Sequence, residues 1–393
     1  MLDRLSPQSP DALLALIKMY AADDRPDKVD LGVGVYRTGQ GGTPVFGAIK
    51  GAEELLLKEQ DSKSYLGPEG DMGFVHALMP YIFGADPSRG GRIEGMQTPG
   101  GTGAVRLALS LVQKAGCTRV HMGVPSWPNH AQILADLGLD LAPFNHVTAD
   151  GLADMDALRQ AIDAAAKTRG DTVLLHGCCH NPTGVDYTND QWDEIAALLA
   201  ETGVLPIIDL AYHGLGHGLE EDAYGLRAVQ AAVPEALIAY SCDKNFGLYR
   251  DRVGALYVMA QDAAAIELVL SNANSLARSN WSMPPDHGAA AVRLALGDSG
   301  LKESWLDELA TMRARLRQVR ERLASAGTAG SVDLTPLGKQ NGMFATLAVS
   351  KEQVRQMRDD HAVYMAGSGR INVAGLTMDN IDKFISALAD VTG

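Results

Sequence analysis

Short apolar runs alternate with longer amphipathic segments through the middle of the chain. The runs have the length and composition of buried strands, whereas the segments between them repeat apolar residues at helical intervals. Strands are predicted over residues 119–122, 141–145, 172–176, 205–209, 237–241 and 255–259. Helices are predicted over residues 105–112, 129–137, 155–167, 189–201 and 223–233. This alternation predicts an α/β fold in which helices flank both faces of a mostly parallel sheet.

Both ends of the chain follow other patterns. Residues 1–11 are polar and contain prolines, which indicates an arm that reaches outward. After residue 260 the pattern becomes mainly helical, and the last part has the mixture that is typical of a smaller α+β unit. In these regions helices are predicted over residues 11–22, 48–59, 288–296, 302–326 and 351–361, and strands over 28–35 and 343–349.

Polar side chains follow three of the predicted strands. The segment Cys-Cys-His-Asn-Pro-Thr-Gly over residues 178–184 follows one strand, Asp209 and Tyr212 follow the next, and residues 241–244 follow a third. In a parallel sheet the carboxyl ends of the strands share one edge, where ligands gather. We therefore expect these three loops to form one rim.

The loop over residues 241–252 places a lysine beside a potential anion site. Lys244 offers an amine, while Arg252 and the Ser241 hydroxyl can hold an anion that carries several oxygens. This combination favours a Schiff-base enzyme. A solvated basic loop between two strands would have the same composition, so these residues alone leave both interpretations open.

A second anion site is expected where glycines open a helix. Gly100, Gly101, Thr102 and Gly103 directly precede the apolar helical run, and free backbone N–H groups there, together with the helix dipole, attract a phosphate. The motif is not a Walker loop, because no Gly-Lys-Ser/Thr follows it.

Glycines 32 and 34 resemble the start of a dinucleotide fingerprint only superficially. Arg37 stands where the third glycine should be, and no helix follows at once, so a nicotinamide site is disfavoured. A glycine at this point more readily allows the backbone to approach a ligand or another chain.

Composition narrows the class of protein and its partners. The chain has 393 residues, 46% hydrophobic and 21% charged, as in an ordinary globular protein with roughly two or three domains. A net charge of -14 argues against nucleic acid or an anionic membrane as the main partner. Apolar runs stay shorter than the roughly 18 residues of a membrane span. The four cysteines match neither a disulfide framework nor a zinc site, and no signal peptide is recognisable, so reduced thiols in the cytoplasm are expected.

Several motifs, in order and at family spacing, resemble those of the aspartate and aromatic aminotransferases, which are pyridoxal-phosphate enzymes of fold type I. They lie over residues 124–130, 176–184, 209–212, 241–252 and 369–375, and the similarity runs from about residue 5 to the C-terminus. The resemblance implies a homodimer with active sites at the subunit interface. It also implies an N-terminal arm over residues 1–11, a small domain built from residues 12–43 and 312–393, and a large pyridoxal-phosphate-binding domain over 44–311.

The resemblance assigns catalytic roles around the cofactor ring. Lys244 would form the Schiff base with pyridoxal phosphate and then move the proton between the substrate Cα and the cofactor C4′. Asp209 would pair with the pyridine nitrogen, so that the ring can accept electrons. Tyr212 and Asn181 would hydrogen-bond the phenolic oxygen of the ring and keep the pKa of the Schiff base low. Trp127 would lie against the ring face.

The resemblance also assigns the phosphate ligands. Gly101, Thr102, Ser241 and Arg252 match the residues of the family that cradle the phosphate. Tyr65, which local sequence alone would present as a packing aromatic, matches a phosphate ligand that the other subunit supplies.

Two arginines are implied in substrate recognition. Arg370 matches the residue that grips the α-carboxylate through two parallel hydrogen bonds, a geometry that lysine cannot reproduce. Arg278 matches an arginine from the neighbouring subunit that reads the side-chain carboxylate of aspartate, glutamate and their 2-oxo acids. Gly34 matches a position where the backbone approaches the substrate. Phe344 and Trp281 would line or back the same pocket, or simply pack in the core.

Two positions depart from the family pattern. Asp243 stands where the family usually has a phosphate-binding serine, and a carboxylate beside a phosphate dianion is repulsive. It is expected to turn away or to pair with an arginine such as Arg252, and it is not included among the site residues. Trp281 replaces a tyrosine that is common in aspartate-selective relatives, so the balance between aspartate and aromatic substrates could differ.

Some cysteines and histidines within these motifs are expected to be structural. Cys178 and Cys179 are interpreted as packing residues, because their spacing does not match a metal site. His180 and His213 are interpreted as hydrogen-bonded groups rather than catalysts.

The expected activity is reversible transamination between amino acids and 2-oxo acids, with aspartate and/or aromatic amino acids and 2-oxoglutarate as substrates in a ping-pong cycle. A pyridoxal-phosphate lyase or decarboxylase on the same fold is the alternative, since it shares the cofactor residues. Arg278 together with Arg370 disfavours it. A transcription factor with an aminotransferase-like module would need a DNA-binding segment, for which the roughly 30 residues before Gly32 leave no room.

Overall fold

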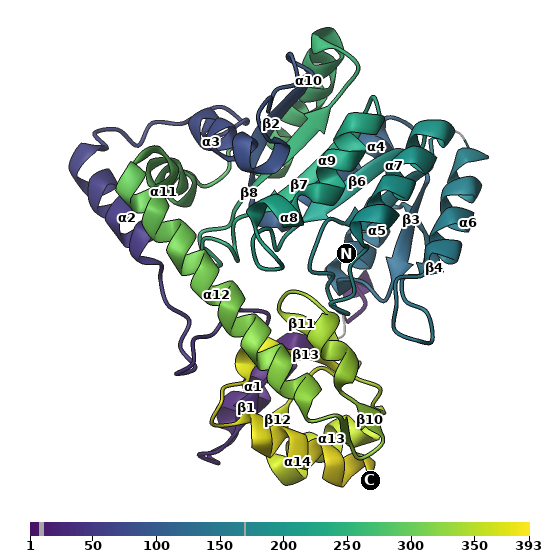
Figure 1. Cartoon of the computed structure of the whole chain (residues 1–393). Coiled ribbons are helices and arrows are strands. Elements are labelled where there is room, and N and C mark those ends of the chain that lie inside the picture. Colours follow the sequence, from purple (N-terminus) through teal and green to yellow (C-terminus); the bar gives the residue numbers. More distant parts are fainter. Residues whose placement is uncertain (8–11, 169) are drawn as a thin grey trace.

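A seven-stranded sheet forms the centre of the larger part of the molecule (Figure 1). The computed structural model describes residues 1–7, 12–168 and 170–393. In spatial order the strands are β2 (Ile93–Pro99), β8 (Val253–Met259), β7 (Ala236–Ser241), β6 (Leu205–Leu210), β5 (Thr172–His176), β3 (Arg119–Val124) and β4 (Asp140–Asn145). Strand β8 runs antiparallel to both of its neighbours, and the remaining neighbouring pairs are parallel. The predicted α/β class with a mostly parallel sheet is confirmed.

Alternate residues of the central strands pack under helices on opposite faces of the sheet. Leu174 and Ile207 lie in one apolar cluster, which helices α4 (Gly100–Lys114), α5 (Pro128–Leu137) and α10 (Ala263–Asn280) complete. Val173 and Ile208 lie in another, against α3 (Met72–Phe83), α6 (Met155–Ala166), α7 (Asn189–Thr202) and α9 (Tyr224–Ala232). Because both faces are covered, these strands consist of almost continuous apolar residues, which is why they were recognisable in the sequence.

The two ends of the chain pack together below the sheet (Figure 1). Strand β1 (Val29–Asp30) pairs in parallel with β12 (Val363–Tyr364), and the Arg25 guanidinium donates to the carbonyl of Arg358 at 2.8 Å. The other elements of this unit are α1 (Ala12–Ala22), β9 (Thr328–Ala329), β10 (Val332–Asp333), β11 (Phe344–Thr346), α13 (Lys351–His361), β13 (Arg370–Asn372) and α14 (Ile381–Thr392). Strand β11 pairs antiparallel with β13, which carries Arg370.

One long helix joins the two parts. Helix α12 (Ser299–Ser325) begins beside α2 (Gly47–Glu59) and α11 (Asp286–Gly297) and ends among the elements of the C-terminal unit (Figure 1). It continues without a break across the domain boundary predicted at residues 311 and 312, so that boundary stays a prediction. Residues 8–11 of the predicted arm, and with them the first residue of the helix predicted over 11–22, lie outside the described residues.

Most predicted elements are present, with bounds shifted by a few residues, but the strand predicted over residues 28–35 is wrong after Asp30. The Asp30 carboxylate accepts hydrogen bonds from the backbone of Gly32 and Val33, and Asn372 donates to the carbonyls of Val33 and Val35. Side chains therefore satisfy this backbone in place of a strand partner. The strand predicted over 343–349 is likewise shorter, at Phe344–Thr346.

Several elements were not predicted from the sequence. Helix α3 contains Pro80, and strand β2 contains Gly95 and ends at Pro99; these residue types weaken the helical and strand patterns. A single short turn of helix, α8 (Leu219–Asp222), precedes α9, and 3-10 turns span Leu2–Arg4, Thr335–Lys339 and Val373–Gly375. Within the described part of the chain, every helix is too short or too polar to cross a bilayer.

Candidate active site

The ends of three neighbouring strands bring together the residues that were expected to share one rim. Asp209 lies at the end of β6, in register with His176 of β5 and Ala239 of β7. From the loops that follow these strands, the Asn181 amide donates to the Tyr212 hydroxyl at 3.4 Å, and the Lys244 amine lies 4.9 Å from the centre of the Tyr212 ring. Lys244, Tyr212, Asn181 and Asp209 therefore converge as predicted.

Burial changes the protonation equilibrium of the Lys244 amine. Desolvation lowers the pKa of Lys244, whereas Asp243 and Asp209 act in the opposite sense and limit the decrease. The neutral amine is thus easier to form than for an exposed lysine, while two nearby carboxylates keep its charged form accessible. Burial, with the negative charge of Asp209, raises the pKa of Tyr212, so its hydroxyl remains a hydrogen-bond donor.

Asp209 is held ionised by a histidine that was not assigned a role from the sequence. The His130 Nε2 atom lies 2.9 Å from Asp209 Oδ2, and both side chains are buried. Burial alone would raise the pKa of Asp209, but the hydrogen bond from His130 and the charge of groups such as Lys244 outweigh it, and the pKa of Asp209 is lowered. Trp127 packs edge-on against His130, with ring centres 5.0 Å apart.

The hydrogen-bond chain continues behind Asp209. Ser126 Oγ bridges His130 Nδ1 at 3.1 Å and His176 Nε2 at 2.9 Å, and the His176 ring lies 4.2 Å from that of His180. His180 in turn stacks on His146, with ring centres 3.6 Å apart. Burial lowers the pKa of His176 to about 3 and also lowers the pKa values of His146 and His180, so these rings are neutral near pH 7.

This chain of rings supports the structural role that was expected for His180. His213, the other histidine interpreted as structural, is also buried. It lies 3.0 Å from the Tyr240 hydroxyl and 2.7 Å from the carbonyl of Leu219.

Glycines, a serine and an arginine lie close together at the start of α4. Gly100 has a left-handed backbone (φ 70°), and a Cβ atom there would lie 2.5 Å from Arg252 Nη2. A Cβ atom on Gly101 would lie 2.8 Å from Ser241 Cβ. Thr102 lies in the same first turn of the helix. Only glycines allow Ser241 and Arg252 to approach this helix N-terminus, and together these groups suit a phosphate.

Asp243 contacts this group of residues at the start of α4. Its Oδ2 atom accepts a hydrogen bond from Arg252 Nη1 at 2.5 Å, so of the two arrangements expected from the sequence the ion pair is the one present. Its Oδ1 atom is buried and has no hydrogen-bond partner among the described residues.

A second arginine lies on the side of the rim that faces the C-terminal unit. Arg370 donates to the carbonyl of Gly32 at 2.8 Å, and its guanidinium lies 4.8 Å from the centre of the Phe344 ring. Phe344 contacts Tyr212 edge-on, with ring centres 5.9 Å apart, and a Cβ atom on Gly34 would lie 3.1 Å from Phe344. The Arg370 Nε atom is buried without a partner among the described residues, so the guanidinium keeps donor capacity that a carboxylate would satisfy.

Two predicted residues lie apart from this cluster in the single chain. The Tyr65 side chain is 92% exposed. Arg278 is exposed at the end of α10, where it hydrogen-bonds Ser282. Both were expected to serve a neighbouring subunit, and that role stays a prediction. Trp281, next to this segment, has a buried Nε1 atom without a partner among the described residues.

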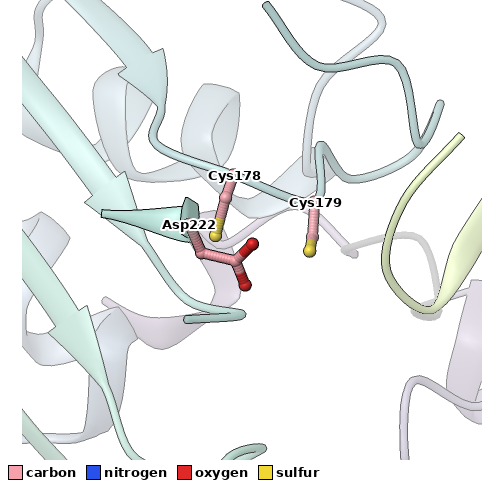
Figure 2. Close-up of side chains that lie close together, drawn as sticks. All are labelled: Cys178, Cys179 and Asp222. Carbon is pink, nitrogen blue, oxygen red and sulfur yellow. The ribbon is translucent and has the colours of Figure 1, made fainter. Parts of the chain in front are cut away.

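The adjacent cysteines lie near an aspartate outside this cluster. Figure 2 shows Cys178 and Cys179 beside Asp222, with ligand-type atoms within 4.8 Å of one another. The Asp222 carboxylate already accepts hydrogen bonds from the backbone of Gly214, Gly216 and His217.

The environment of the two thiols disfavours metal binding. A hydrogen bond with Cys179 acts to lower the pKa of Cys178, but burial and nearby carboxylates outweigh it and raise the pKa to about 12. A hydrogen bond with Cys178, together with burial, raises the pKa of Cys179. Metals bind the thiolate form. The interpretation of these cysteines as packing residues therefore stays our prediction.

The sequence matches a known family of enzymes. The family model described as "Aminotransferase class I and II" matches residues 26–388. The chain belongs to this family. The chain is 48% identical over 377 residues to the tyrosine aminotransferase of Rhizobium meliloti (strain 1021), with 96% of each chain covered. It is 40% identical over 397 residues to the aspartate aminotransferase of Escherichia coli (strain K12), with 100% of each covered.

The fold matches in the same way. A solved structure of the aromatic-amino-acid aminotransferase from Burkholderia pseudomallei, covalently bound to pyridoxal phosphate, has a TM-score of 0.95 and 32% identity, with 100% of both chains covered. The family resemblance and the fold type I architecture are thus confirmed. The chain is a transaminase, and the lyase or decarboxylase alternative is not favoured.

Proposed function

We propose that this transaminase uses pyridoxal 5′-phosphate to move an amino group between aspartate and/or aromatic amino acids and 2-oxoglutarate. The observation that carries the proposal is the position of the Lys244 amine, 4.9 Å from the Tyr212 ring centre, at the rim that Asp209 and Asn181 share. The relatives include enzymes named for tyrosine and for aspartate, so both substrate classes are retained in the proposal.

The donor set at the rim suits the parts of this cofactor. The group formed by Gly101, Thr102, Ser241 and Arg252 offers backbone N–H groups, a hydroxyl and a guanidinium to a phosphate. The ionised Asp209 suits a protonated pyridine nitrogen. When bound, pyridoxal phosphate supplies an electron sink for the charge that develops at the substrate Cα.

Other groups at the rim would orient the ring. Asn181 and Tyr212 offer donors to its phenolic oxygen, and Trp127 would cover one ring face, as the family resemblance implies. Asn181 Oδ1 is buried without a partner among the described residues, so this amide also keeps capacity for a ligand.

Lys244 and Asp209 would have different roles in the reaction. Lys244 would take the proton from the substrate Cα and deliver it to the C4′ atom of the cofactor. A lysine whose pKa is lowered by burial is suited to this role. Asp209, held by His130, would keep a positive charge on the ring nitrogen throughout the cycle. Because each half of the reaction uses the same groups, the two substrates would react in turn, in a ping-pong order.

Substrate carboxylates would be held by the two arginines. Arg370, with its buried and unpaired Nε, would take the α-carboxylate, and Gly34 allows the backbone to lie close on the same side. Arg278 would reach the site of a neighbouring subunit and read a side-chain carboxylate, and Tyr65 would reach its phosphate. Their exposed positions support a homodimer with shared sites, in which both side chains become covered.

The chain is proposed to form two domains and to be located in the cytoplasm. The packing of the chain ends against each other supports a small domain made from residues 12–43 and 312–393, beside a large domain over residues 44–311. The cytoplasm is proposed as the compartment on the expectation of reduced thiols; all four cysteines are free and buried.

A half-reaction panel tests the proposed function. The purified holoenzyme is mixed with aspartate, tyrosine, phenylalanine, tryptophan or glutamate in the absence of any 2-oxo acid, and the absorbance spectrum of the cofactor is followed. A transaminase converts the cofactor once and stops, and 2-oxoglutarate then restores the starting spectrum. The ratio of rates identifies the preferred donor, whereas continued turnover of an amino acid without a 2-oxo acid would support a lyase instead.

A further inference from the structure

Asp243 is a buried carboxylate that precedes Lys244 in the chain and contacts Arg252. It is 5% exposed. One oxygen accepts from Arg252, but Oδ1 is buried without a partner among the described residues. An unsatisfied carboxylate oxygen is costly to bury, and such exceptions are often found at functional sites.

The two terminal nitrogens of Arg252 lie near different groups, one near this carboxylate and one near the expected phosphate site. Its Nη1 atom donates to Asp243 Oδ2 at 2.5 Å and to the carbonyl of Tyr249 at 3.0 Å. Its Nη2 atom lies at Gly100, at the start of α4. The backbone of Arg252 is left-handed (φ 57°), which is uncommon for a residue other than glycine. While Nη1 of Arg252 donates to Asp243, the guanidinium can offer the phosphate only some of its N–H donors.

The same carboxylate acts on Lys244. Among the charged groups around this lysine, Asp243 contributes most to raising its pKa against the effect of burial. Asp243 therefore lies close enough to influence both cationic groups at the site, Arg252 and Lys244. Its negative charge offsets part of the positive field that attracts a phosphate dianion.

We propose that Asp243 is a positioning residue that keeps Arg252 only partly available to the cofactor phosphate, so that the bound cofactor exchanges more readily. The inference rests on the proposed function, because it concerns the phosphate of pyridoxal phosphate. Replacement of the carboxylate frees Nη1 for the phosphate and removes a like charge beside it, and both effects slow the release of the cofactor.

The test measures cofactor exchange in the holoenzyme rather than activity. Wild-type protein and the variants Asp243→Ser and Asp243→Asn are mixed with an excess of deuterium-labelled pyridoxal phosphate. Samples are reduced with borohydride, and the ratio of the two masses is followed in time. Exchange is expected to slow by about tenfold to a hundredfold in Asp243→Ser, which is the size of one charge-assisted hydrogen bond, and by less in Asp243→Asn, whose amide oxygen can still accept from Arg252. The asparagine keeps the shape and an acceptor for Arg252, so it separates the effect of charge from a loss of structure.

Two controls make the result specific. Asp251→Ser removes a carboxylate next to Arg252 in the chain that is not one of the hydrogen-bond partners described for the guanidinium, and it should exchange at the wild-type rate. Proteins loaded with pyridoxal, which lacks the phosphate, should release it at similar rates whether or not they contain Asp243. Unchanged or faster exchange of pyridoxal phosphate in the folded Asp243 variants would overturn this inference. So would a release of pyridoxal that slows in these variants as much as the release of pyridoxal phosphate does. Neither result would affect the proposed function. A wild-type protein that binds no pyridoxal phosphate would overturn the proposed function as well.

Discussion

Asp209 and His130 form a buried pair in which the imidazole Nε2 donates to the carboxylate at 2.9 Å. The pair links the end of strand β6 to helix α5, and Ser126 extends it to His176. Burial alone would raise the pKa of Asp209, but the hydrogen bond from His130 helps to keep this carboxylate ionised. Asp209 can therefore serve as the counterion of the proposed cofactor. His130 is therefore a positioning residue for Asp209.

Replacement of His130 should weaken catalysis without removing the cofactor lysine. His130→Ala removes the donor, and because a hydrogen bond to a charged group contributes about 1.5–3 kcal/mol, kcat/KM should fall by about tenfold or more. His130→Gln, which can still donate to Asp209, should lose less. The measurement is kcat/KM for aspartate and phenylalanine, together with a pH titration of the cofactor spectrum. Equal losses in the two variants with an unshifted titration would show that His130 serves packing only.

Arg278 is expected to select among substrates. Arg278→Ala should reduce kcat/KM for aspartate more than for phenylalanine, because only aspartate carries a second carboxylate to pair with the guanidinium. Loss of that charge-assisted pair corresponds to about tenfold or more for aspartate. The ratio of the two kcat/KM values, measured in wild type and variant, checks this. Equal losses for both amino acids would contradict its role as the reader of the side chain.

Shared sites predict complementation between an inactive Lys244 variant and a weakened Arg278 variant. A Lys244→Ala subunit lacks the amine but can supply its Arg278, whereas an Arg278→Ala subunit keeps the amine. Heterodimers of the two should therefore contain one complete site and regain a substantial fraction of the wild-type turnover of aspartate. The experiment co-expresses differently tagged chains and assays the doubly purified species. No recovery in verified heterodimers would argue against a site built from two subunits.

Buried histidines should make the fold sensitive to acid. Burial lowers the pKa of His176 to about 3 and that of His213 to about 4, whereas an unfolded histidine titrates near 6.5. The unfolded chain therefore binds protons first. The stability that the neutral rings confer is present above pH 6.5 and is lost as pH falls towards 4 and 3. Each such histidine contributes about 1.4 kcal/mol per pH unit over that range.

Denaturant titrations between pH 8 and pH 5 at one protein concentration measure this effect. His213→Gln, which lacks the titrating ring, should show a decline in unfolding free energy that becomes shallower than that of the wild type below about pH 6.5, by up to one proton near pH 5. The comparison of slopes cancels the contribution of the carboxylates that both proteins share. Identical slopes would mean that His213 does not resist protonation in the folded state.

The strand ends explain why much of the site could be predicted. Asp209 and Lys244 follow apolar runs that both faces of the sheet bury, and such runs are recognisable without knowledge of the partner strands. The direction of β8 was not predictable in this way, because a strand buried on both faces has the same composition whether it runs parallel or antiparallel.

Other features depend on contacts between distant residues. His130 lies 79 residues from Asp209 along the chain, so its hydrogen bond leaves no local signal beyond its place in a motif. The segment after Asp30 was wrongly predicted to continue as a strand. Its carbonyls accept hydrogen bonds from Asn372, which belongs to the other end of the chain, so the local sequence contains no sign of this contact. Asp243 was recognised as unusual, and the structure supplies its partner, Arg252.

Lys244 is proposed to hold the cofactor and to release it to an amino acid. The most direct measurement reduces the holoenzyme with borohydride, digests it, and identifies the modified lysine by mass spectrometry. We predict a label on Lys244 that disappears when aspartate or an aromatic amino acid is added before reduction and returns when 2-oxoglutarate follows. A label on a different lysine, or a label on Lys244 that no amino acid removes, would contradict the account.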